Sequence, residues 1–167
     1  MKVWISTIST SKFSGINTLW AAMMRENFIP DRIHLINLTT KDKKNKARET
    51  TLKGYHSLLQ RYGAKGKPVV HDVVGDDFSG LAKELESIVR KEKLKGHTVA
   101  IDMTPGRKVM SAFAMYMGVG TQLEYRADRI YYFFLDDPEG FYGKQPFPLL
   151  PSNAVTLYDL KKEVLGK

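Results

Sequence analysis

The residues with the clearest chemical potential form a short turn between two apolar runs: Asp102, Met103, Thr104, Pro105, Gly106, Arg107 and Lys108. Pro105 and Gly106 predict a tight turn, because glycine readily adopts a positive φ. Thr104 could cap the helix that follows or donate a hydrogen bond to an oxyanion. Arg107 and Lys108 would lie in the first turn of that helix, where the macrodipole disfavours cations. An anion bound at this turn would explain their placement, with Lys108 as a point charge.

An alternative interpretation of Arg107 and Lys108 is a pair of surface cations, tolerated at about 0.3–1 kcal/mol each. Asp102 ends the apolar run before the turn and could organise either the turn or Lys108. We expect a structural role for Asp102 rather than a catalytic one.

A second loop rich in hydroxyl groups follows the first apolar run and contains Ser9, Thr10, Ser11, Lys12, Ser14 and Gly15. Backbone N–H groups at the start of a helix, together with hydroxyl donors, suit a phosphate oxygen. The loop matches neither the GxxxxGK[ST] spacing of a P-loop nor the GxGxxG dinucleotide fingerprint. An ordinary turn with a helix cap is the alternative interpretation.

Two acidic residues, Asp76 and Asp77, follow a third apolar run. Either could hydrogen-bond a ribose or a base, although a helix cap is the simpler role, and Asp77 is the expected cap of the next helix.

The four histidines are His34, His56, His71 and His97, and they show neither metal-ligand nor acid–base spacing. None has a partner that the sequence makes visible, so structural roles are expected. The zinc, calcium and nucleophile-elbow motifs are missing as well. The sequence therefore predicts neither a metal site nor a cofactor.

The apolar pattern that must position these loops alternates between strand-like and helix-like segments. We expect strands over 2–8, 32–38, 68–74, 98–103 and 129–135, and helices over 16–27, 78–95 and 109–119, with a further helix that ends at Gly63. Residues 154–165 fit a short strand or a closing helix. Strands alternating with helices predict an α/β fold, a Rossmann-like, doubly wound and mostly parallel sheet with helices on both faces. Ligands of such sheets bind beyond the carboxyl ends of the strands.

The composition predicts one domain over residues 1–167, with 26 Lys and Arg against 18 Asp and Glu and no cysteine. A net charge of +8 favours anionic partners, or simply a solvated basic face. The most basic segment, 41–53, could close over a ligand or form a solvated helix face. Because no apolar run is long enough to span a membrane and no signal peptide is visible, we expect a cytoplasmic protein with no membrane partner.

Residues 99–110, together with residues 3–11, resemble the CARF family, the CRISPR-associated Rossmann-fold domains. Members carry a turn of the type D-x-T-x-G-x-K-x-M after a strand, which is matched here by Asp102, Thr104, Gly106, Lys108 and Met110. This sequence departs from many members in having proline at 105 and arginine at 107.

The resemblance implies a homodimer that binds cyclic oligoadenylate across its two-fold axis, with the four-membered ring as the first expectation. A single CARF-like domain of this length resembles the stand-alone ring nucleases. Those enzymes need no metal and leave linear products with 2′,3′-cyclic phosphate ends. Carried over, the catalytic residues would be Lys108 and Ser11, with Ser9 or Thr10 as the alternative hydroxyl. The ligand-binding residues would be Ser9, Thr10, Lys12, Ser14, Thr104, Pro105, Gly106, Arg107 and Asp76.

Two other functions compete with the ring nuclease. The protein could be a non-catalytic sensor that binds cyclic oligoadenylate and acts through a partner. It could also bind nucleic acid through its basic surface, but helix-turn-helix, zinc-knuckle and RNP signatures are missing, so stable duplex DNA binding is not expected.

Phe141 and Tyr142 could stack on adenine or pack at a dimer interface.

Overall fold

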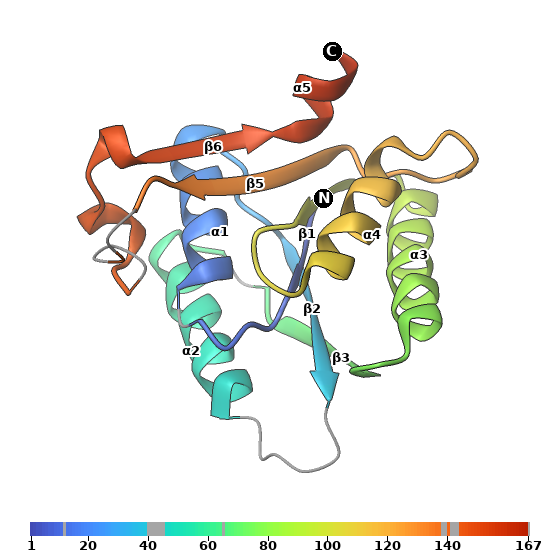
Figure 1. Ribbon diagram of the computed structural model, residues 1–167, viewed down its shortest axis with the longest axis horizontal. Helices are drawn as coiled ribbons and strands as arrows, with labels where there is room; N and C mark the ends of the chain where they lie inside the picture. Colours follow the sequence, from blue (N-terminus) through green and yellow to red (C-terminus); the bar gives the residue numbers. More distant parts are fainter. Residues whose placement is uncertain (12, 40–45, 65, 138–139, 141–143, 167) are drawn as a thin grey trace.

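Six strands form one sheet in the order β3-β2-β1-β4-β5-β6. The strands are β1 (Lys2–Thr7), β2 (Arg32–Thr39), β3 (Pro68–Val74), β4 (Thr98–Asp102), β5 (Arg129–Leu135) and β6 (Val155–Asp159). The helices are α1 (Ser14–Arg25), α2 (Lys46–Arg61), α3 (Phe78–Leu94), α4 (Lys108–Val119) and α5 (Leu160–Leu165). This computed structural model describes residues 1–11, 13–39, 46–64, 66–137, 140 and 144–166 (Figure 1).

The first five strands pair in parallel, and only β6 runs antiparallel to its neighbour β5. The chain builds outward from β1 to β2 and β3, then returns to place β4 on the other side of β1. The order of the strands therefore switches between β1 and β4, and a crevice is expected at their carboxyl ends. The prediction of a Rossmann-like, mostly parallel α/β sheet is confirmed.

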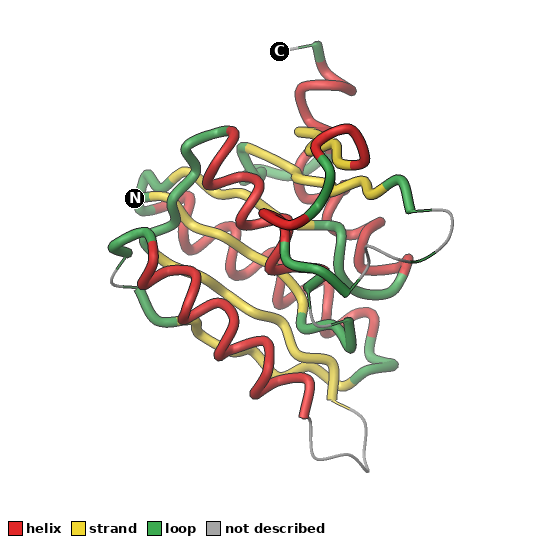
Figure 2. The backbone as a smooth tube through the Cα atoms, turned by 90° about the vertical axis from the view of Figure 1, so that its left-hand side faces the viewer, coloured by secondary structure: helices red, strands yellow, loops and turns green. Residues whose placement is uncertain are grey.

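Helices cover both faces of the sheet, as the continuous apolar strands predict (Figures 1 and 2). On one face, α1 and α2 pack over Trp4, Leu35 and Tyr131, all of them fully buried. On the other face, α3 and α4 pack over Val3, Ile36 and Ile130. Alternate residues of β1 thus pack into two separate cores, so this central strand is buried on both faces.

A close contact joins α1 to α2. A Cβ placed on Gly54 of α2 would lie 2.2 Å from Cδ1 of Ile16 on α1, so any larger residue there would require the end of the Ile16 side chain to move. Tyr62 also accepts a hydrogen bond from Nε1 of Trp20 at 3.1 Å. The two helices are thus joined at two points.

The end of the chain contains both elements that the sequence left open, because β6 is followed directly by α5. The segment before β6 is tied to α1 through the buried side chain of Asn17. Its Nδ2 donates to the carbonyl of Gln145, and its Oδ1 accepts from the backbone N–H of Phe147. This connection orients the region between β5 and β6.

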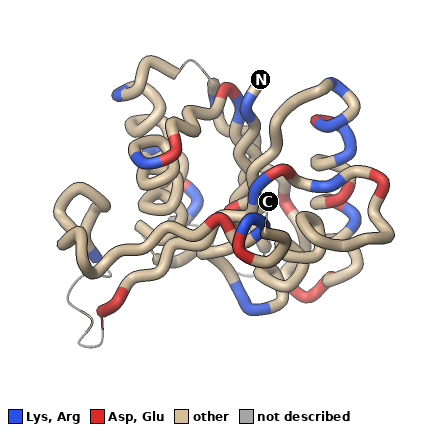
Figure 3. The backbone as a smooth tube through the Cα atoms, turned by 90° about the horizontal axis from the view of Figure 1, so that it is seen from above, with Lys and Arg blue, Asp and Glu red and all other residues tan. Residues whose placement is uncertain are grey.

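Helix and strand bounds differ from the sequence prediction by a few residues at most, with α1 starting at Ser14 instead of residue 16. Residues 41–45 of the basic segment, and Phe141 and Tyr142, lie outside the described residues. In the part of the chain that the structure describes, no helix is long and apolar enough to cross a membrane. Basic and acidic residues are interspersed along the chain (Figure 3).

Candidate anion-binding site at the carboxyl edge of the sheet

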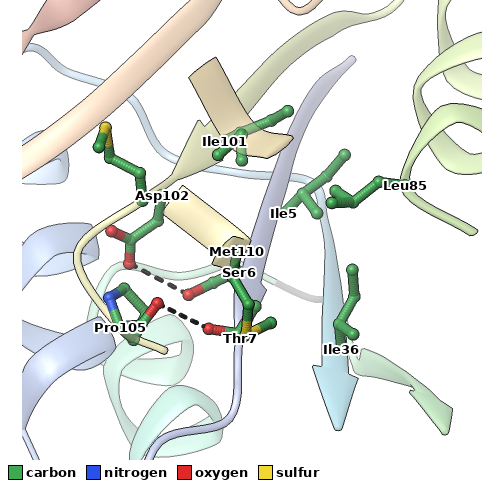
Figure 4. Close-up of a pocket in the computed structure, with 11 residues that line it drawn as sticks. Ile5, Ser6, Thr7, Ile36, Leu85, Ile101, Asp102, Pro105 and Met110 are labelled. Carbon is green, nitrogen blue, oxygen red and sulfur yellow. Dashed lines mark hydrogen bonds between the residues drawn. The ribbon is translucent and has the colours of Figure 1, made fainter. Parts of the chain in front are cut away.

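The loops after β1 and β4 lie against each other where the strand order switches. Oγ1 of Thr7 donates a hydrogen bond of 2.9 Å to the carbonyl of Pro105 (Figure 4). A Cβ on Gly15, in the first turn of α1, would lie 3.4 Å from Cγ of Pro105. The structure therefore brings together the two loops that the sequence singled out separately.

Gly106 is required by both the conformation of the turn and its close packing. Its φ is +106°, which side-chain-bearing residues rarely adopt. A Cβ there would also lie 2.8 Å from Oγ1 of Thr7 and from Sδ of Met110. The prediction of a tight Pro-Gly turn is confirmed.

Asp102 organises the turn, which is one of the two roles that the sequence left open for it. Its Oδ1 accepts the backbone N–H of Thr104 at 2.9 Å, and its Oδ2 accepts Oγ of Ser6 at 3.1 Å. The far end of the turn is held by Oγ of Ser111, which donates to the carbonyl of Met103 at 3.0 Å. These bonds fix the backbone that leads to Lys108.

Of the two roles left open for Thr104, a helix cap or a donor to an oxyanion, the structure does not show the cap. Helix α4 begins at Lys108, and its N-cap residue is Arg107, which makes no side-chain capping bond. Oγ1 of Thr104 instead accepts the backbone N–H of Phe133 on β5 at 2.8 Å. The hydroxyl reaches β5 because β5 is the direct neighbour of β4. The Thr104 side chain also hydrogen-bonds the carboxylate of Asp102, which favours the charged form of that group.

Lys108 is exposed at the first position of α4. Among the described residues, no carboxylate forms an ion pair with it. Arg107 is exposed too, but one guanidinium nitrogen approaches the carbonyl of Gly75 at 3.4 Å, so Arg107 leans toward the loop after β3. That loop carries the exposed Asp76, whereas Asp77 caps α3 by accepting the N–H of Gly80 at 2.8 Å.

The loop after β1 presents hydroxyl groups at the surface. Thr10 and Ser11 are exposed, and the backbone N–H of Ser11 donates to Oγ of Ser9 at 3.1 Å. Ser14 is the first residue of α1, whose N-cap, Phe13, offers no side-chain capping bond. Lys12 lies outside the described residues.

A buried polar cluster beneath both loops was missed by the sequence reasoning. It comprises Ser6, Thr18 and Asp102, together with Tyr55 from α2, whose hydroxyl has no hydrogen-bond partner in the described structure. Burial raises the pKa of Asp102 to about 7, against the opposing effect of hydrogen bonds from Thr104, Ser6 and Thr18. Burial and the nearby Asp102 raise the pKa of Tyr55 as well. The signal in the sequence was the polar Ser6, which follows the apolar run Val3–Ile5 within the first strand.

Three of the four histidines have partners that the sequence did not make visible. Nδ1 of His34 lies 2.8 Å from Nε2 of His71, whose Nδ1 lies 2.6 Å from Oε1 of Glu84. His97 and Arg32 both bind the buried Glu92, at 2.7 and 2.8 Å. These groups join β2 and β3 to α3, and none belongs to the two loops.

Burial and the neighbouring His71 lower the pKa of His34 to about 4. Burial alone would raise the pKa of Glu92, but the hydrogen bonds from His97 and Arg32 lower it to about 2. Nowhere among the described residues do three or more His, Cys, Asp or Glu side chains gather in a way that could hold a metal ion.

A void of about 10 Å³ lies below the turn, on the α3 and α4 side of the sheet (Figure 4). Thr7, Ile36, Leu85 and Met110 are among its lining residues. Its size suits a single water molecule. A larger ligand would have to bind the exposed side of the loops.

A model of the family described as CRISPR-associated protein NE0113 matches residues 20–147. The chain belongs to this family. The match includes the turn at 102–108 but begins after the hydroxyl-rich loop that follows β1. No match for this sequence was found among the curated proteins.

A solved structure similar to this CRISPR-associated chain is Enterococcus italicus Csm6 bound to cyclic hexa-2′-fluoro-hexa-dAMP. The two share 12% sequence identity with a TM-score of 0.61. The alignment covers 99% of this chain and 44% of that one, so the chain spans less than half the length of its structural relative. Together with the family match, the shared fold confirms the resemblance to CARF proteins.

Proposed function

We propose that this CARF-like protein is a ring nuclease that binds cyclic oligoadenylate at the paired loops and slowly cleaves it. The observation that carries the proposal is the contact between Thr7 and Pro105. It joins a loop with exposed hydroxyls to a turn that ends in Lys108, which is exposed and has no ion-pair partner within the described ranges. An anionic ligand over this edge would meet donors from both loops at once.

The similar structure of Csm6 supports the chemical class of the ligand, because that protein is bound to a cyclic hexanucleotide analogue. Cyclic oligoadenylate carries one phosphate per nucleotide, which suits the net charge of +8. A homodimer would supply two copies of each loop to a ring with matching symmetry.

Cleavage would use the nucleotide's own nucleophile. The 2′-hydroxyl attacks the adjacent phosphorus in line, the bond from phosphorus to the 5′-oxygen breaks, and a 2′,3′-cyclic phosphate forms. The 2′-hydroxyl proton leaves to water, and the departing 5′-oxygen takes a proton from water. Ser11 and Lys108 would act by holding the phosphate and stabilising the charge on its oxygens.

Slow turnover follows from the groups that the loops present. Neither loop places an imidazole or an exposed carboxylate beside Ser11 or Lys108 within the described ranges, so proton transfer would lack strong help. The same observation favours the second candidate, a sensor that binds cyclic oligoadenylate without cleaving it.

The test is a single-turnover incubation of the purified protein with labelled cyclic tetra- and hexa-adenylate in the presence of EDTA. The proposal expects linear products with 2′,3′-cyclic phosphate ends from wild type, and a loss of at least about tenfold in rate or affinity in Lys108→Ala and Ser11→Ala. Lys83→Ala, which removes an exposed lysine from α3, is the matched control and should behave as wild type. Tight binding with the ring left intact would establish the sensor instead. Salt-sensitive binding of any nucleic acid, with no preference for the rings, would contradict both.

A further inference from the structure

Asp102 has an unusual position for a carboxyl group. It is the last residue of β4, it is only 2% exposed, and it lies beneath the point where the two loops meet. One oxygen holds the turn through Thr104, and the other accepts from Ser6 of β1. The carboxyl group is therefore next to the site without reaching its surface.

The surroundings of Asp102 supply hydrogen bonds but no compensating positive charge. Ser6 comes from β1, Thr18 from α1 and Thr104 from the turn, and all three are neutral. The titratable groups that face it are the phenols of Tyr55 on α2 and Tyr131, its register partner on β5. No lysine or arginine among the described residues forms an ion pair with it.

We infer that Asp102 takes up a proton when an anionic ligand occupies the two loops, so that ligand binding is coupled to proton uptake. The inference rests on the proposed function, because it needs a phosphate above the carboxyl group. Two negative charges that share one buried region repel each other, and protonation of the carboxylate removes the repulsion. By linkage, the ligand then binds more tightly as pH falls.

The hydrogen bonds around Asp102 can accommodate the proton without loss of the turn. Oδ1 continues to accept the N–H of Thr104, and a protonated Oδ2 can donate to Oγ of Ser6. The hydroxyl of Ser6 is then free to turn away. The Tyr55 hydroxyl is the candidate acceptor, because it and Oγ of Ser6 both lie within 3.2 Å of the position that a Cβ on Gly15 would take. Tyr55 is otherwise unpartnered in the described structure.

Burial supports the same conclusion, because it already holds the pKa of Asp102 at about 7 in the unliganded protein. A further rise in this pKa on ligand binding would protonate the carboxyl group within the neutral pH range. Asp102 is thus a positioning residue whose charge state responds to the ligand, although it does not touch the ligand.

The test is calorimetric titration of the full chain with cyclic tetra- and hexa-adenylate in two buffers of different ionisation enthalpy. Wild type should take up a fraction of a proton per site near neutral pH. The affinity of wild type for the ring should fall between about pH 6 and about pH 8.5. The fall should reach about tenfold for each pH unit by which the bound ligand raises the pKa of Asp102. Asp102→Asn keeps one acceptor and one donor but cannot be ionised, so it should bind without proton uptake and with a flat pH profile.

Glu124→Gln is the matched control, because it removes one carboxylate from the exposed loop between α4 and β5. It should retain the wild-type proton uptake. If Asp102→Asn does not fold, the carboxyl carbon of Asp102 in wild type can be followed by NMR, and its titration midpoint should rise when the ring is added.

Ring binding with no proton uptake, equal uptake in Asp102→Asn, or an unchanged NMR midpoint would overturn the inference and leave the proposed function standing. Failure of either ring to bind at any pH would overturn both. The two failures are therefore distinguishable.

Discussion

The hydroxyl of Thr7 donates to the carbonyl of Pro105 at 2.9 Å, across 98 positions of the chain. This bond joins the end of β1 to the turn after β4 at the point where the strand order switches. It fixes the distance between the two loops, so its loss should affect ligand binding as well as stability.

Thr7→Val removes this bond with little change in shape. We expect a loss of about 1–2 kcal/mol in the free energy of unfolding, because the buried carbonyl of Pro105 loses its donor. Ring affinity should fall with it. Urea denaturation and ring titration measure the two effects. Thr39→Val removes a comparable bond, from Oγ1 to the carbonyl of Val73 at 3.2 Å, and should leave ring affinity unchanged. Equal effects of the two variants on affinity would contradict the role assigned to Thr7.

Gly106→Ala should destabilise the protein more than Gly96→Ala does. Both glycines have positive φ, which costs about 1–2 kcal/mol for alanine. A Cβ on Gly106 would also clash with Thr7 and Met110, whereas one on Gly96 meets nothing within 4 Å. Thermal unfolding of the two variants isolates the contribution of packing. Similar losses in both would show that the turn can relax around the methyl group.

Acid should destabilise the protein through His34 and Glu92. The pKa of His34 falls from 6.5 to about 4 on folding, so the unfolded chain binds the extra proton and stability drops as pH falls through this window. The pKa of Glu92 falls from 4.5 to about 2, so its contribution is present above 4.5 and is lost as pH falls below it. His34→Gln should reduce the loss of unfolding free energy between about pH 7 and about pH 5, an effect on the order of 1–2 kcal/mol.

His56→Gln serves as the control for that experiment, because His56 is exposed on α2. It should keep the pH dependence of wild type. A pH profile that His34→Gln leaves unaltered would place the acid-sensitive group elsewhere.

Asp102 should contribute with the opposite sign. Its pKa rises from 3.8 to about 7 on folding, so the folded state holds a proton that the unfolded chain releases. This contribution is complete below about pH 3.8 and is lost as pH rises to about 7. Asp102→Asn should therefore gain stability relative to wild type across that range. Denaturant unfolding of both proteins at pH 5 and at pH 8 checks the direction, and a constant difference would exclude it.

The strands, the helices on both faces and the turn at 102–108 could be predicted, because they depend on local patterns. Val99–Ile101 is an apolar run, Pro105 and Gly106 mark a turn, and the period of α4 follows at once. Asp77 as a cap is local in the same sense, since its partner Gly80 is three residues away.

The partners of Thr104 and the histidines could not be predicted, because they depend on which strands become neighbours and in what register. Thr104 bonds to Phe133 only because β5 pairs with β4. His34 meets His71 only because β2 and β3 align in parallel, with α3 above them. Tyr55 reads as an ordinary apolar position of a helix, and its place beneath the loops follows from the packing of α2 against α1.

The contact between Gly54 and Ile16 has a mechanical consequence. The close approach at Gly54 and the hydrogen bond between Trp20 and Tyr62 couple α1 to α2. We therefore expect a displacement of the start of α1, where the loop after β1 ends, to move α2 as well. The unit that responds to an event at the first loop is then a helix pair, and its fully buried Tyr55 contacts the core.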